Sequence, residues 1–170
     1  MVGNTIFKRK IFPKKLIVLL LVAGAIVYSC DKLETYPPVP EIHFKNFTII
    51  DSATDYYQKK GVLAIDFVDG DGDLGLDTAS TVDSLNADVF IKLQKKINGQ
   101  YITDTSKYNY IMPYMEKTGQ NKTLKGTIKI KFEYTKAFIN QYDTIRYYFY
   151  IVDRAKHHSN TDTTSDIGLK

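Results

Sequence analysis

Three aspartates separated by single glycines are the side chains of this sequence best suited to chemistry. They lie in the stretch FVDGDGDLGL (residues 67–76) as Asp69, Asp71 and Asp73, and Asp77 follows directly. Glycine lets the backbone curl, so the three carboxylates can converge on one point. Without a cation their negative charges would repel one another, and hard oxygen ligands of this kind suit Ca²⁺. The spacing therefore predicts a calcium-binding loop.

A plain structural turn explains the same stretch, because aspartate bonds its own backbone and glycine accepts positive φ. An EF-hand is excluded: Leu74 stands where that loop needs glycine, and Ser80 stands where it needs a bidentate glutamate. Catalytic carboxylates are a third interpretation. The residues alone leave these three interpretations open.

Cys30, the only cysteine, ends a segment that is built like an export signal. Five basic residues lie within residues 8–15, and an apolar run over residues 16–28 follows them. The run is shorter than the roughly 20 residues of a membrane-spanning helix, which is the alternative interpretation. The tetrapeptide VYSC (residues 27–30) resembles the lipobox of bacterial lipoproteins. That resemblance implies that residues 1–29 are removed and that Cys30 carries acyl chains, which would hold the protein on a membrane.

The positive charge of the chain belongs to this signal. Of the 23 basic and 19 acidic residues, the signal contains five basic and no acidic ones, so the remainder carries 18 against 19. A near-neutral remainder without a basic patch argues against nucleic acid as a partner. Apart from Cys30 it has no cysteine, and it has no nucleophile-elbow, zinc-protease or phosphate-loop motif, so we expect no enzymatic activity. His157 and His158 lack a third zinc ligand, and we expect them in an exposed polar loop.

Alternating apolar and polar residues predict β-strands through most of the remaining chain, as in IKIKF (residues 128–132). The dipeptide Asn98-Gly99 predicts a tight hairpin, because both residues tolerate positive φ. A single helical turn is expected over residues 135–141. The strands or extended segments are expected over residues 41–50, 61–68, 88–97, 100–105, 108–116, 124–134, 143–152 and 161–169.

Strands of this number and spacing predict an all-β fold, an immunoglobulin-like β-sandwich of about seven to eight strands after an N-terminal signal helix. Residues 67–76 and YYFYIVDRAKHHSN (residues 147–160) resemble segments of small immunoglobulin-like or fibronectin-type-III-like lipoproteins of the Bacteroidota type, a family of largely unassigned function. In such a sandwich the loops after residues 61–68 and after residues 143–152 lie at the same end. We therefore expect Asp153 to add an oxygen ligand to the aspartate group.

The predicted organisation is a signal peptide over residues 1–29, a lipid-anchored, Pro-rich tether over residues 30–40 and a sandwich domain over residues 41–170. We expect a cell-envelope protein, held at the outer membrane on its periplasmic or its outer face. The expected function is a non-catalytic binding or adhesion module, stabilised by calcium, with a protein or glycan partner. The alternatives are an accessory subunit of an envelope or nutrient-uptake complex and a glycan-binding lipoprotein.

Overall fold

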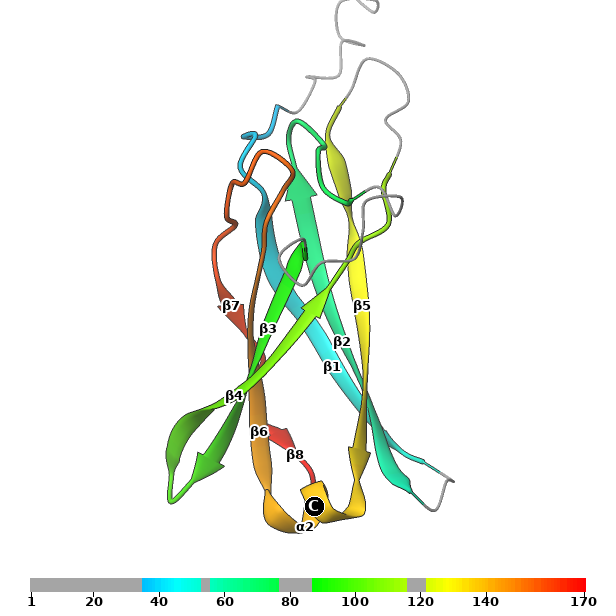
Figure 1. Ribbon diagram of the computed structural model, residues 1–170, viewed down its shortest axis with the longest axis vertical. Coiled ribbons are helices and arrows are strands. Elements are labelled where there is room, and N and C mark those ends of the chain that lie inside the picture. Colours follow the sequence, from blue (N-terminus) through cyan, green and yellow to red (C-terminus); the bar gives the residue numbers. More distant parts are fainter. Residues whose placement is uncertain (1–34, 53–55, 77–86, 116–121) are drawn as a thin grey trace, which may run out of the picture. The chain divides into compact units, whose positions relative to one another are not determined.

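Two antiparallel sheets form a sandwich, as predicted (Figure 1). The computed structural model describes residues 35–52, 56–76, 87–115 and 122–170, all within the compact unit Thr35–Lys170. Among these residues, no helix has the length and apolar character to cross a membrane. The elements are β1 (Glu41–Asp51), β2 (Tyr57–Asp69), β3 (Val89–Ile97), β4 (Gln100–Tyr110), β5 (Leu124–Thr135), α2 (Lys136–Gln141), β6 (Thr144–Ile151), β7 (Asp162–Thr163) and β8 (Ile167–Gly168).

The strand order fits the immunoglobulin-like sandwich expected from the sequence. One sheet has the order β1-β2-β5, and the other has the order β4-β3-β6-β7, with β8 also paired to β6. All of these pairs are antiparallel. The end of β2 therefore lies at the same end of its sheet as the start of β1, where Glu41 pairs with Val68.

Alternation along the strands builds one core between the sheets. Ile130, Phe132 and Tyr134 of β5 are buried while the residues between them are exposed. Tyr147 and Phe149 of β6 are buried and alternate with half-buried residues. The rings of Phe132 and Tyr147 stack with their centroids 4.3 Å apart. The hydroxyl groups of Tyr134 and Tyr147 lie 2.8 Å apart and bond each other. The core thus accommodates two tyrosines without leaving these hydroxyls unpaired.

The observed strands match the expected ones, with three differences. β2 begins earlier than predicted, and the segments 100–105 and 108–116 are largely one strand, β4. The last predicted strand, 161–169, is instead two short strands. Thr164 explains this break, because its Oγ1 accepts a hydrogen bond from the backbone N–H of Tyr147 at 3.0 Å, where a continuous strand would offer a carbonyl.

Both local turn signals are confirmed. Asn98 and Gly99 connect β3 to β4 with positive φ values of 51° and 80°. α2 occupies the expected helical turn, and Thr135 caps its N-terminus by accepting a hydrogen bond from the N–H of Phe138 at 3.3 Å.

Side chains join the two sheets along one side of the sandwich. Oδ1 of Asn160 accepts a hydrogen bond from the N–H of Ile42, and its Nδ2 donates to the carbonyl of Ile42, each at 2.8 Å. Oδ2 of Asp162 accepts a hydrogen bond from the N–H of Phe44 at 2.6 Å. These contacts occupy the outer backbone groups of β1 near its start, so that part of the edge is closed to a further strand.

Candidate metal centre

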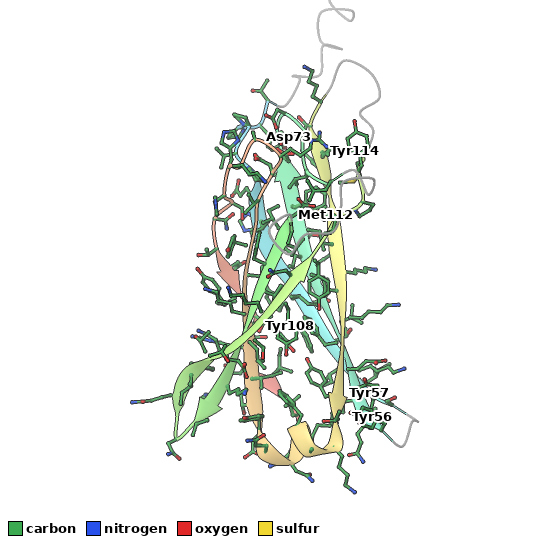
Figure 2. The ribbon with its side chains drawn as sticks, viewed as in Figure 1. Tyr56, Tyr57, Asp73, Tyr108, Met112 and Tyr114 are labelled. Atoms are coloured by element: carbon green, nitrogen blue, oxygen red, sulfur yellow. The ribbon has the colours of Figure 1, made fainter. Side chains whose placement is uncertain are left out.

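The three aspartates of the Asp-Gly run meet at one end of the sandwich. Asp69 is the last residue of β2, and Asp71 and Asp73 follow in the loop that starts there. One carboxylate oxygen from each lies within 4.8 Å of the other two. Figure 2 shows Asp73 at the end opposite to Tyr56 and Tyr57. In the part of the chain that the structure describes, this is the one group of three or more potential ligand side chains, and it could hold a metal ion.

Backbone from two other segments crosses the glycines of this loop. A Cβ atom on Gly70 would collide with the carbonyl oxygens of Tyr36 and Pro37, and one on Gly72 would collide with that of Lys122. The N–H of Gly70 donates a hydrogen bond to the Pro37 carbonyl at 3.0 Å. The loop therefore requires glycine at both positions, and two residues of the predicted tether lie directly on it.

In two carboxylates of the group, only one of the two oxygens accepts a hydrogen bond. Oδ2 of Asp69 accepts a hydrogen bond from the N–H of Leu74, and Oδ2 of Asp73 accepts one from the N–H of Ala155, both at 3.0 Å. Oδ1 of each aspartate is buried and accepts no hydrogen bond, and Asp69 as a whole is 0% exposed. A buried polar atom without a partner costs free energy. A cation would give both atoms a partner, so this donor set fits a metal ion.

Burial and mutual repulsion both oppose ionisation of the group. Burial, together with the charges of Asp71 and Asp73, raises the pKa of Asp69 to about 6. Burial also raises the pKa of Asp73, and the charges of Asp153 and Asp71 act in the same direction. The fold thus holds these carboxylates where negative charge is disfavoured, and a bound cation would remove that cost.

The loop after β6 meets this end of the sandwich, as the topology predicts. The N–H of Arg154 donates to the Asp73 carbonyl at 3.3 Å. Asp153 is 1% exposed, and one of its carboxylate oxygens accepts the N–H of His157 at 2.7 Å while the other lies 2.8 Å from the Nδ1 atom of that ring. Asp153 lies outside the group of three, so its role as a further ligand stays a prediction. Asp77 lies outside the described residues.

Another buried carboxylate, Asp88, was not expected from the sequence. It directly precedes β3, is 2% exposed, and its Oδ2 accepts a hydrogen bond from the N–H of Met112 at 3.2 Å. Burial raises its pKa to about 6, although the positive charges of Lys156 and Arg154 act in the opposite direction. The sequence places Asp88 at the start of the expected strand 88–97, with no further acidic residue beside it, so no pattern marks it as a buried carboxylate in advance.

The other predicted functional residues lie apart from this group or outside the described residues. Cys30 is outside them, so its lipidation stays a prediction. His158 is exposed, as expected of a polar loop, and its ring stacks on that of Tyr150 with the centroids 5.6 Å apart. Within the described ranges, the one potential metal group contains no histidine.

Comparison of the chain with protein-family models, with curated proteins and with solved structures finds no match. The resemblance to immunoglobulin-like lipoproteins therefore rests on the sequence segments that suggested it. The structure supports a coarser statement, namely a two-sheet β domain with an acidic group at one end.

Proposed function

We propose that this chain is a non-catalytic binding module of the cell envelope, anchored through lipid on Cys30 and stabilised by calcium at Asp69, Asp71 and Asp73. The calcium part rests on one observation above all, the two buried Oδ1 atoms of Asp69 and Asp73 that accept no hydrogen bond. The envelope part rests on the signal-like sequence that precedes Cys30.

Calcium suits this donor set better than the other common cations. The side-chain donors are all carboxylate oxygens, whereas structural zinc sites use cysteine and histidine. Mg²⁺ demands a near-ideal octahedron, whereas Ca²⁺ accepts about six to eight oxygens in irregular geometry. Three carboxylates supply part of such a shell, and we expect backbone carbonyls, water and Asp77 to complete it.

The surroundings of the loop favour a structural role for the ion. The carbonyl of Gly70 accepts a hydrogen bond from Oγ1 of Thr123 at 3.3 Å, and its N–H donates to Pro37. On the other side, Asp73 accepts the N–H of Ala155. An ion in the loop would therefore stabilise contacts among several segments at this end of the domain, and a rigid end is useful to a binding module.

Thermal unfolding with and without calcium tests the site. The purified protein should melt at a higher temperature in about 5 mM CaCl₂ than in EGTA, because a ligand at about 100 times its Kd stabilises by about 2.7 kcal/mol. The variants D69N and D73N should lose this shift, and the variant D51N, at the exposed end of β1, should keep it. A wild-type protein with neither a shift nor measurable heat of calcium binding would refute the calcium part.

Intact-mass spectrometry tests the anchor. Protein purified from the membranes of its native host should lack residues 1–29 and carry a thioether-linked diacylglycerol on Cys30. The variant C30S should remain unlipidated. Native protein with an unmodified Cys30 would refute the envelope part and leave the calcium part untouched.

A further inference from the structure

The sandwich is open on the side away from the contacts of Asn160 and Asp162 with β1. β5 pairs with β2, and β4 pairs with β3 (Figure 1). In the described part of the chain, the second edge of each of these strands pairs with no other strand. An unpaired edge presents backbone N–H and carbonyl groups that can accept a strand from another chain.

A groove of about 560 Å³ follows the unpaired edge of β5. Ile128 and Ile130 line it from the inner face of the strand, and Thr127, Lys129 and Lys131 line it from the outer face. Side chains from both faces can border one groove only where that groove runs along the edge of the strand. The groove thus lies where an added strand would lie.

The opposite wall of the groove is apolar. It contains Tyr110 at the end of β4, followed by Met112 and Met115. A second cavity of about 300 Å³ shares Tyr110 with the first and extends to Tyr108 and Phe132. Figure 2 shows Met112 above Tyr108 along this part of the molecule. Methionine adapts its shape to a partner, and tyrosine contributes strongly to binding, so this wall suits apolar side chains of a ligand.

The outer rim of the groove carries positive charge without a counter-charge in the described ranges. Lys129 and Lys131 are exposed, and each stands opposite an uncharged residue of β2. The acidic residues on the same face of this sheet already have partners: Glu133 pairs with Lys60, Asp66 pairs with Lys45, and Glu41 lies 3.1 Å from the ring of His43. The rim is therefore complementary to acidic side chains.

We propose that the β5 edge binds an extended segment of another protein as an added strand, in which acidic and apolar residues alternate. Successive side chains of a strand point to opposite faces of the sheet. The apolar residues enter the groove beside Ile128 and Met112, and the acidic residues lie beside Lys129 and Lys131. Backbone hydrogen bonds with β5 supply affinity, and the alternation supplies specificity.

This inference rests on the proposed function as a binding module, but it is independent of calcium and of the lipid anchor. Lysines on an edge strand also have another explanation, because their charge discourages edge-to-edge aggregation. The two explanations predict different behaviour when Lys129 and Lys131 are replaced, since only the first makes them part of a binding site.

Peptide binding to the purified full-length protein tests the proposal. The probe is a fluorescein-labelled peptide of about nine residues, the length of a strand, in which Glu and Val alternate. Fluorescence anisotropy should show saturable binding that weakens about tenfold in the variant K129E/K131E and weakens with added salt. The variant K92E/K136E reverses two exposed lysines elsewhere and should bind like the wild type.

Two control peptides separate strand addition from simple charge attraction. One has the same composition with all Glu residues at one end, and the other is the alternating peptide methylated on every second backbone nitrogen. Each should bind about tenfold more weakly than the probe, since the first loses the facial pattern and the second loses backbone hydrogen bonds.

Three results would overturn the proposal: equal binding of the grouped peptide, unchanged binding to K129E/K131E, or no binding of the probe at about 1 mM. Self-association of a K129S/K131S variant, without peptide binding by the wild type, would assign the lysines to aggregation control. A positive calcium test with a negative peptide test would overturn this inference alone.

Discussion

The buried carboxylates determine how the stability of this protein depends on pH. The pKa values of Asp69 and Asp88 are raised to about 6, mainly by burial. Each therefore keeps its proton in the folded state at a pH where the unfolded chain, with an ordinary pKa of 3.8, has lost it. Asp104 behaves in the opposite way, because a hydrogen bond from Lys95 lowers its pKa to about 2.

In metal-free buffer, the free energy of unfolding should rise as the pH falls from about 7 to about 5. Between about pH 4 and 6 the folded state binds more protons than the unfolded state, so stability decreases as the pH increases through that window. Below about pH 4 the trend should reverse, because Asp104 loses the stabilisation that its ionised form receives from Lys95. Urea unfolding in EGTA across this range measures the trend.

The variant D69N should flatten the upper part of this pH profile. Protons and calcium compete for Asp69 and Asp73, so bound calcium should oppose the gain in stability at lower pH. The calcium-dependent shift in Tm should therefore shrink toward about pH 5. Stability that increases steadily from about pH 5 to 7 without metal would contradict the inference that burial disfavours the charged form of these carboxylates.

The sequence alone identifies the three aspartates, but it does not identify the neighbouring residues that determine their burial and hydrogen bonding. The alternation of Asp69, Asp71 and Asp73 with glycine is visible in the sequence, and the structure brings these three side chains together. The burial of Asp88 and the contacts of Asp153 with His157 arise only when the chain folds. Such burial depends on distant segments, so a local pattern could not indicate it.

Among the elements, the turns use glycine for two different reasons. Gly99, at the tip of the β3–β4 hairpin, has a φ of +80°, and a Cβ there would meet nothing within 4 Å. Gly72 has a φ of +64°, and a Cβ there would collide with the carbonyl oxygen of Lys122. The first position requires only a backbone conformation, whereas the second also requires space.

Gly72→Ala should therefore destabilise the protein much more than Gly99→Ala. At Gly99 the cost is that of placing alanine in a left-handed conformation, about 1 kcal/mol. At Gly72 the collision adds to this cost, and we expect about 3 kcal/mol or more. Gly168→Ala has open space and no positive φ and serves as the control. Urea unfolding measures all three, and equal costs at Gly72 and Gly99 would show that the Lys122 segment moves aside freely.

Alternation located β1, β2, β3, β5 and β6 because each of these strands buries mainly one face, which gives the period of two that the sequence displays. The same signal could not place the break between β7 and β8. That break depends on a hydrogen bond between Thr164, which lies between β7 and β8, and Tyr147 of β6. A threonine in a run of polar residues gives no sign of which strand lies beside it.

At the scale of the whole molecule, the two sides of the sandwich differ in whether their strand edges are occupied. Asn160 and Asp162 occupy backbone groups of β1, whereas the edges of β4 and β5 pair with no other strand in the described ranges. We therefore expect a partner strand to bind on the side of β4 and β5. On the side of β1 it would first have to displace Asn160 and Asp162.

Replacing both side chains, as in N160A/D162A, removes three hydrogen bonds to β1 and should cost about 3 kcal/mol of stability and promote self-association. The substitution leaves backbone groups of Ile42 and Phe44 without their partners, and each such loss costs about 1 kcal/mol where water can partly replace it. Thr161→Ala changes the exposed residue between them and should behave like the wild type. Urea unfolding and analytical ultracentrifugation measure the two effects. A monomeric double variant of unchanged stability would show that these contacts contribute little.

The side chains that occupy β1 also limit how copies of this protein can polymerise. Growth of a fibre by successive strand addition needs two receptive edges on every copy, one for each neighbour. In the described ranges, β5 is the one edge of the three-stranded sheet that is open along its full length, so two copies joined there would leave this sheet no second full-length edge. Growth beyond such a pair would have to use the edge of β4 in the other sheet.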